Sequence, residues 1–190
     1  MAETIDIVEQ AICFATKAHM GATRKGCGLP YIVHPMEAMT IVASMTSDKE
    51  VIAAAALHDV VEDTAYTIED IRENFGERVA MLVAHETENK RPDLPKADTW
   101  KIRKQEQLEQ AVDAPIEAKM IMLADKLSNL RASLRDYRKN GAGIWQKFNM
   151  KDEREQEWYF RKVAEILSEL RDTASYQEYV SIIEEVFPKE

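Results

Sequence analysis

Two adjacent residues, His58 and Asp59, end the apolar run VIAAAAL and carry side chains that are well suited to metal chemistry. Neutral imidazole and ionised carboxylate both ligate divalent metal ions. Adjacent helical residues point about 100° apart, so the two can share one ion best near a helix end, where the backbone loosens. In isolation, the pair is better explained as a capping aspartate beside a buried, hydrogen-bonded histidine.

Two further residues favour the metal hypothesis. His34 precedes Pro35 at the start of a predicted helix, and Asp125 lies inside the apolar helical run IMLADKLSNL. A lone aspartate in such a run is costly unless it is paired or bound to metal. Two histidines and two carboxylates form a mixed nitrogen and oxygen set, which suits Mn, Fe, Ni or Zn better than Ca or Mg. We therefore predict a metal site formed by His34, His58, Asp59 and Asp125.

A second pair of acids, Glu62 and Asp63, follows closely in the segment HDVVEDT. If the helix continues for one turn, Glu62 lies on the same side as His58 and Asp59. Carboxylates beside a water that a metal activates can orient this water or exchange protons with it. Solvated loop acids are the simpler alternative, but the short spacing favours a catalytic role. This set of residues alone predicts cleavage of a phosphoester or phosphoanhydride.

The elements that position these residues are predicted to be helices, because apolar residues recur at helical spacing along most of the chain. No stretch of period-two alternation is long enough to predict a sheet. Caps and breakers predict a capping box at Ser47–Glu50, a weaker one from Thr67 to Asp70, a helix end at Gly76, and Pro115 in the first turn of a helix through Arg135. Further helices are predicted at 77–88, 99–111, 152–171 and 175–186, and loops at 21–33, 60–66 and 89–98.

Composition narrows the class of protein. The chain has 190 residues, of which 45% are hydrophobic and 31% charged, as expected for one folded domain. A net charge of −9 argues against a nucleic-acid partner, although local cations and a metal can still hold a small anionic ligand. Cys13 and Cys27 have no metal-like spacing, and two cysteines in a chain of this length do not make a disulfide framework. With no signal peptide and no apolar run near the roughly 20 residues of a membrane span, we expect a cytoplasmic protein without a membrane partner.

Three segments resemble, in order, the signature blocks of the HD-superfamily hydrolases of the RelA/SpoT type. They are AHMGATRKGCGLPYIVHP, HDVVEDT and ADKLSNLR, and the signature blocks lie within them at 19–35, 58–64 and 124–131. The resemblance covers about residues 5 to 165 and implies a single all-α HD domain, 1–190, of about eight to ten helices. It also implies hydrolysis of the 3′-pyrophosphate of the alarmones guanosine tetraphosphate and pentaphosphate, giving GDP or GTP and pyrophosphate. The length is similar to that of free-standing small alarmone hydrolases.

The resemblance implies a role for each residue of the site. The metal ligands of that family, which usually bind manganese, correspond to His34, His58, Asp59 and Asp125. The acidic pair that activates water corresponds to Glu62 and Asp63. The residues that hold the nucleotide correspond to Arg24, Lys25, Tyr31 and Asn129, with Arg24 stacking on the base. Chemically, a guanidinium can stack on a purine while a lysine neutralises phosphate, although an exposed basic turn is the simpler alternative.

Three departures from the family pattern concern the nucleotide. The loop between Lys25 and Pro30 is one residue longer than in long Rel proteins, Met122 stands where many relatives carry a basic residue, and Ala132 replaces a frequent threonine. We expect these changes in the pocket rather than at the metal. They leave open an adenine alarmone or NADPH as substrate. A nucleoside monophosphatase of the HD type is a separate alternative, against which the segment HDVVEDT speaks, and a non-catalytic nucleotide sensor is another, against which the intact pair of Glu62 and Asp63 speaks. The sequence also leaves open a homo-oligomer and the roles of Lys90, Arg103 and Lys104.

Overall fold

The computed structural model describes residues 5–24, 28–91 and 93–188. Within these ranges the chain forms ten α-helices and two short 3-10 helices, and its only β pairing is an isolated bridge between Thr23 and Pro30. The predicted all-α class is confirmed, and the number of α-helices lies within the predicted range. No helix in the described part of the chain has the length and apolar character that crossing a membrane requires.

Most of the helices follow one another through short connections, and the longer ones are residues 19–32 and 87–95. The first six are α1 (Ile7–Ala18), α2 (Val33–Ala43), α3 (Lys49–Leu57), α4 (Val60–Asp63), α5 (Ile68–Phe75) and α6 (Glu77–Glu86). The others are α7 (Lys96–Val112), α8 (Ile116–Asn140), η1 (Gly141–Lys147), α9 (Glu153–Ile166), η2 (Leu167–Leu170) and α10 (Ala174–Val186).

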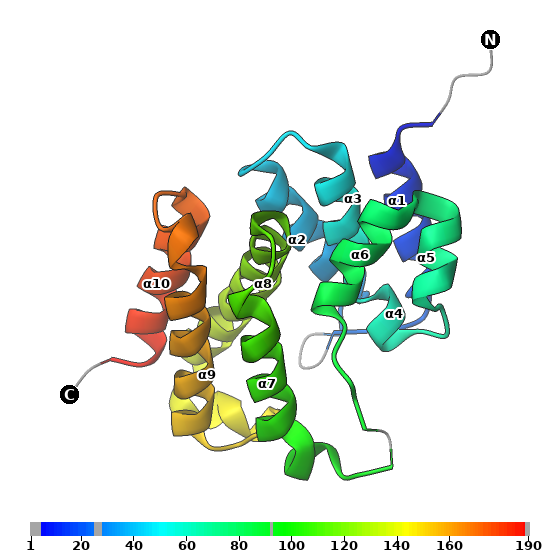
Figure 1. The fold of residues 1–190 in the computed structure, drawn as a ribbon. Helices are drawn as coiled ribbons and strands as arrows, with labels where there is room; N and C mark the ends of the chain where they lie inside the picture. Colours follow the sequence, from blue (N-terminus) through cyan, green and yellow to red (C-terminus); the bar gives the residue numbers. More distant parts are fainter. Residues whose placement is uncertain (1–4, 25–27, 92, 189–190) are drawn as a thin grey trace.

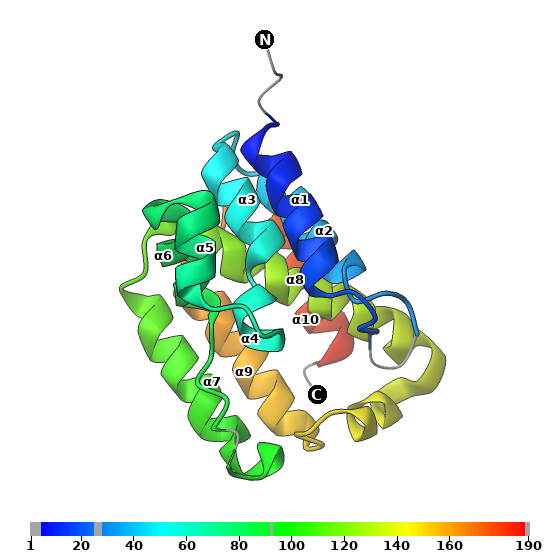
Figure 2. The ribbon, with the colours of Figure 1, turned by 90° about the vertical axis from the view of Figure 1, so that its right-hand side faces the viewer.

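The long helix α8 is the central element of the fold. It packs against α2, α3 and α6 and also against α10 and η1. In Figure 1, α1 to α6 lie to the right of α8, and α9 and α10 lie to its left. The view turned by 90° shows α8 behind α3, α4 and α1 (Figure 2). A residue in the middle of α8 can therefore meet residues from α2 and α3.

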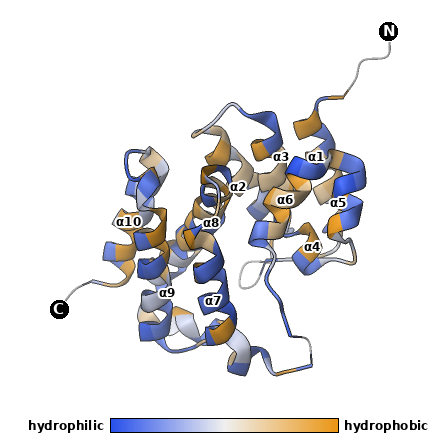
Figure 3. Ribbon diagram, viewed as in Figure 1, coloured by the Kyte–Doolittle hydropathy of each residue, from blue (hydrophilic) through white to orange (hydrophobic). Residues whose placement is uncertain are grey.

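Small, buried side chains explain why α3 packs closely against several neighbouring helices. Its four alanines, 53–56, are completely buried, and small side chains allow a helix to approach its neighbours closely. Helix α3 contacts α1, α2, α6 and α8. Figure 3 shows hydrophobic residues where these helices meet, whereas α7 is largely hydrophilic. The close packing of α3 places the residues that follow its last turn at the centre of the molecule.

The ends of the helices confirm some predicted caps and correct others. Thr67 and Asp70 form the predicted capping box of α5, and Gly76 ends that helix with a φ of 87°, which favours glycine. The cap of α3 is Asp48 rather than Ser47, and its carboxylate accepts from the backbone N–H of Glu50 at 3.0 Å. A carboxylate at this position also interacts favourably with the helix dipole, which makes the later start reasonable.

The predicted loop after Asp59 is wrong in its first half, because residues 60–63 form the one-turn helix α4. The backbone N–H of Asp63 donates to the carbonyl of Asp59 at 2.9 Å, and Val60 is completely buried. The apolar anchor explains why the chain turns once more instead of leaving the surface of α3. This extra turn is the condition under which Glu62 was expected beside His58.

Other boundaries differ from the prediction by several residues. Helix α7 begins at Lys96 and helix α6 ends at Glu86. Pro115 is the N-cap of α8, which continues beyond Arg135 to Asn140 and ends at Gly141, whose φ is 58°. The predicted helix 152–171 is α9 followed by η2.

Candidate metal centre and adjoining cavity

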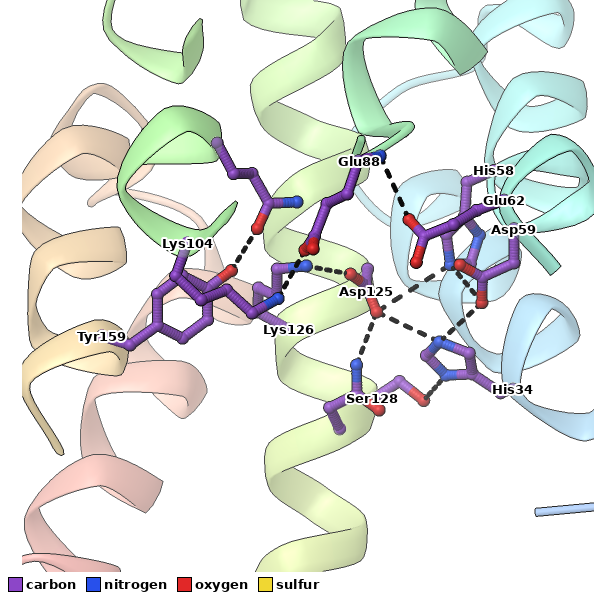
Figure 4. Close-up of polar contacts among 12 residues, drawn as sticks. His34, His58, Asp59, Glu62, Glu88, Lys104, Asp125, Lys126, Ser128 and Tyr159 are labelled. Atoms are coloured by element: carbon purple, nitrogen blue, oxygen red, sulfur yellow. Dashed lines mark hydrogen bonds and ion pairs between the residues drawn. The ribbon is translucent and has the colours of Figure 1, made fainter. Parts of the chain in front are cut away.

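Four side chains from different helices meet around one point. His34 comes from the first turn of α2, His58 and Asp59 connect α3 to α4, and Asp125 lies in the middle of α8 (Figure 4). The Nε2 atom of His34 lies 3.4 Å from Asp59 Oδ2 and 3.1 Å from Asp125 Oδ1. The Nε2 atom of His58 lies 3.1 Å and 3.8 Å from the same two oxygens. The fold thus brings together the four residues that the sequence predicted as ligands.

The hydrogen bonds of His58 determine which of its two ring nitrogens has a free lone pair. Its Nδ1 lies 2.8 Å from the carbonyl oxygen of Ala55, which can only accept, so Nδ1 carries the proton. In the neutral ring, Nε2 then has a free lone pair. This Nε2 is buried and has no hydrogen-bond partner of suitable geometry among the described residues. A buried polar atom without a partner requires an explanation.

In the neutral ring of His34, hydrogen bonds with side chains likewise place the proton on Nδ1. Its Nδ1 lies 2.8 Å from Ser128 Oγ, and the Ser128 hydroxyl donates its own proton to Glu37 Oε2 at 2.8 Å. The serine oxygen must therefore accept from Nδ1 of His34. This arrangement again leaves the lone pair on Nε2, and such outer partners typically orient metal-binding histidines.

Two imidazole lone pairs thus face two carboxylate oxygens, an arrangement that is repulsive without a positive charge between them. Burial opposes protonation of His58, but Asp59 and Asp125 outweigh it and raise its pKa to about 10. The site therefore strongly favours positive charge. The candidate ligand atoms of His34, His58 and Asp59 lie within 4.8 Å of one another, and Asp125 Oδ1 lies near both histidines. This donor set fits a divalent metal ion.

The two carboxylates are oriented by neighbours. The Tyr31 hydroxyl donates to Asp59 Oδ2 at 2.7 Å; burial and then Asp59 raise the Tyr31 pKa, so the hydroxyl keeps its proton. Lys126 pairs with Asp125 Oδ2, and Asn129 Nδ2 donates to Asp125 Oδ1 at 2.6 Å. Burial acts to raise the Asp125 pKa, but Lys126 and the histidines hold it well below its usual range. Asp125 is therefore an ionised group within the core.

The acids of the segment HDVVEDT occupy the turn beside these residues. Figure 4 shows Glu62 next to Asp59, and Glu62 Oε2 accepts the backbone N–H of Glu88 at 3.3 Å. Burial, with Asp59 and Glu88, raises the Glu62 pKa to about 7. Asp63 forms an ion pair with Lys90, which also lies 3.6 Å from Glu62 Oε1. Lys90 therefore forms ion pairs with both acids of this segment, whereas the sequence left its role open.

A cavity of about 510 Å³ adjoins this centre, within the size range of small-molecule sites. Its walls include His34, Asp63 and the predicted nucleotide residues Arg24, Tyr31 and Asn129. Arg24 donates from Nη2 to Asn129 Oδ1 at 3.2 Å, and its guanidinium carbon lies 5.9 Å from the centre of the Tyr31 ring. The predicted nucleotide residue Lys25, and also Cys27, lie outside the described residues.

The structure corrects one expectation about the residues that line the cavity and adds three aromatic residues to them. Ala132 lines the cavity as expected, but Met122 is buried and faces a small separate cavity between α6, α7 and α8, so it does not line the nucleotide pocket. The aromatic residues Trp145, Tyr159 and Phe160 are buried and line the large cavity.

Sequence reasoning missed the residues that orient the site. These are Glu37, Glu88, Lys126 and Ser128. The only available signal was the position of Lys126 and Ser128 inside the segment ADKLSNLR, because the contacts of Glu37 and Glu88 with the site are not visible in any local pattern.

The sequence is similar to proteins of known family. The sequence model of the HD domain family matches residues 11–154. A Xenopus tropicalis protein named guanosine-3′,5′-bis(diphosphate) 3′-pyrophosphohydrolase MESH1 is 35% identical over 181 residues, 94% of this chain and 92% of that protein. A Danio rerio protein of the same name is 40% identical over 128 residues, 66% of this chain and 68% of that protein.

Solved structures lead to the same family. One of them, described as a metazoan orthologue of SpoT that hydrolyses ppGpp and plays a role in starvation responses, matches with a TM-score of 0.72 and 31% identity over 97% of both chains. A Listeria monocytogenes protein matches with a TM-score of 0.72 and 32% identity over 82% of this chain and 99% of that chain. Together with the sequence matches along nearly the whole chain, these likenesses place the protein in the HD domain family, as a homologue of the MESH1 hydrolases.

Proposed function

We propose that this protein is a metal-dependent 3′-pyrophosphohydrolase of guanosine tetraphosphate and pentaphosphate, giving GDP or GTP and pyrophosphate. The observation that carries the proposal is that the two-histidine, two-aspartate centre adjoins the cavity, which His34 lines together with Arg24, Tyr31 and Asn129. Relatives named as guanosine-3′,5′-bis(diphosphate) 3′-pyrophosphohydrolases support it. The three signature blocks support the view that residues 1–190 act as one HD-type domain.

In this proposal His34, His58, Asp59 and Asp125 ligate one divalent ion, and manganese is the metal expected from the donor set and the resemblance. When bound, the ion supplies positive charge for the phosphate oxygens and favours ionisation of water. In the neutral rings, Ser128 and the carbonyl of Ala55 hold the proton on Nδ1, which leaves the lone pair of each Nε2 for this task. Tyr31 fixes the Asp59 carboxylate while it also lines the cavity.

Glu62 and Asp63 are proposed as the acids that position the attacking water and accept its proton. The raised pKa of Glu62, about 7, lies close to neutral pH, where a carboxyl group exchanges protons efficiently. Lys90 forms ion pairs with both acids and offsets part of their negative charge. The carboxylates are held next to the candidate metal ligands by α4, whose single turn begins directly after Asp59.

Arg24, Lys25, Tyr31 and Asn129 are proposed to hold the nucleoside, with the 3′ side directed to the metal. The contact between Arg24 and Asn129 orients the guanidinium along the cavity wall, where it can stack on a purine. A substrate panel tests the choice of nucleotide: guanine and adenine alarmones, NADPH and nucleoside monophosphates. The guanine alarmone is expected to have the highest kcat/KM, and Ala132 in the cavity wall is the reason to include the adenine alarmone and NADPH.

Replacing Arg24 with alanine is expected to weaken nucleotide binding by about 1 to 3 kcal/mol, because a base that stacks on the guanidinium loses that contact. The measurement is KM for the guanine alarmone, with metal content determined in parallel and expected to stay unchanged. Arg138→Ala is the matched control, because Arg138 lies further along α8 and pairs with Glu185. A fall in kcat with an unaltered KM would remove Arg24 from the base site.

A further inference from the structure

The segment that joins α6 to α7 contains a buried acid, Glu88, whose side chain is 5% exposed. Arg103 Nη1 donates to its Oε2 at 2.5 Å, and Lys104 Nζ donates to its Oε1 at 2.6 Å. Burial acts to raise the Glu88 pKa, but Lys104, Lys126 and Arg103 outweigh it and lower the pKa. Glu88 is therefore an ionised group that two cations of α7 fix in place.

The backbone of the same residue contacts the acidic pair. The N–H of Glu88 donates to Glu62 Oε2 at 3.3 Å. The other carboxylate oxygen, Oε1, lies 3.6 Å from Lys90 Nζ in an ion pair. Figure 4 shows Glu88 between Lys104 and Glu62. The backbone and the side chain of Glu88 thus link the acid of α4 to helix α7.

This link matters because the connecting segment has little structure of its own. Residues 87–91 belong to no helix, and such segments move unless specific contacts hold them. The two charge-assisted hydrogen bonds from α7 are stronger than ordinary ones. They fix the backbone of Glu88, and the direction of its N–H determines where the Glu62 carboxylate points.

We propose that Glu88 is a positioning residue: anchored to α7 by Arg103 and Lys104, it holds Glu62 by its backbone N–H in the orientation that hydrolysis requires. This inference rests on the role proposed for Glu62. It also gives Arg103 and Lys104 the task of holding Glu88, whereas the sequence left open whether they bind terminal phosphates.

The variant Glu88→Gln tests the proposal. It keeps the size of the side chain but loses the charge that attracts Arg103 and Lys104. We expect kcat for pyrophosphate release from guanosine tetraphosphate to fall by about 10- to 100-fold, the usual effect of losing an outer partner, with KM and metal content unchanged. Glu88→Asp keeps the charge and should recover part of kcat. The matched control is Glu106→Gln, because Glu106 is an exposed acid of α7 that pairs with Arg91 of the same segment, and it should keep the parental kcat.

A double variant separates positioning from a general structural effect. If Glu88 acts through Glu62, then Glu62→Gln/Glu88→Gln should be no slower than Glu62→Gln alone, since coupled residues are not additive. Independent, multiplied losses would overturn the proposal, as would a raised KM with an unchanged kcat. If Glu88→Gln does not fold, Arg103→Gln applies the same test. It removes one of the two cations that anchor Glu88, and Arg103 does not line the cavity.

The parent protein distinguishes this inference from the proposed function. A parent without activity on any 3′-diphosphorylated nucleotide would overturn the proposed function and this inference with it. An active parent together with a Glu88→Gln variant of equal kcat would overturn this inference alone.

Discussion

Asp125→Ala is expected to lose the divalent metal and, with it, all measurable hydrolysis. The carboxylate supplies one of the two oxygens that face both histidines. The other acids of α8, Glu117 and Asp136, lie more than two helical turns away along the helix, too far to replace it. The variant should also lose stability on the order of 3 to 5 kcal/mol, because Lys126, 8% exposed, loses its ion-pair partner. Elemental analysis of the purified variant measures the metal, and denaturant unfolding measures the stability.

His58→Ala separates these two effects. It removes a proposed ligand but leaves the pair between Asp125 and Lys126 intact, so metal should be lost without that stability cost. Asp136→Asn, which changes an acid on the same helix that pairs with Lys147, should keep the metal. Full metal occupancy in both Asp125→Ala and His58→Ala would contradict the proposed ligand set.

Glu62→Gln is expected to keep the metal and the fold but to lower kcat by about 10² to 10⁴-fold, the usual contribution of a positioned acid or base. The glutamine can still accept the N–H of Glu88, but it cannot take a proton from water. Binding and turnover should therefore separate: KM stays near the parental value while kcat falls.

The pH dependence gives a second readout for the same variant. Only the ionised Glu62 can accept a proton, so kcat should rise with pH through its pKa. Burial, with Asp59 and Glu88, raises this pKa to about 7, and a bound cation would bring it below that value. This acidic limb should disappear in Glu62→Gln. A variant within a few-fold of the parent, with the limb retained, would assign the role to another group such as Asp63.

Much of the fold could be predicted because helices depend on local sequence. Periodic apolar residues located most helices, and Thr67, Asp70 and Gly76 marked the ends of α5. The errors concern competition between neighbours: Ser47 and Asp48 are both good caps, and only the packed structure selects Asp48. The turn of α4 was not predicted because it depends on the burial of Val60, which no local pattern reveals.

In the candidate site, too, locally encoded features could be predicted, whereas contacts between distant residues could not. Residue types alone were enough to select His34, His58, Asp59 and Asp125, because histidine and aspartate in apolar helical segments are costly without a partner. The groups that orient them could not be predicted. Ser128 and Glu37 are 91 residues apart, and Glu88 meets Glu62 across 26 residues and two helices. Met122 was expected in the nucleotide pocket, but its place on α8 turns it toward a different cavity.

The central claim is that the metal centre cleaves the 3′-diphosphate of a guanine nucleotide. Incubation of the purified protein with guanosine tetraphosphate and Mn²⁺, followed by chromatography of the products, tests it most directly. We predict GDP and pyrophosphate in equal amounts, and no product when the metal is removed by a chelator. Release of orthophosphate instead, or no reaction with any 3′-diphosphorylated nucleotide, would contradict the claim.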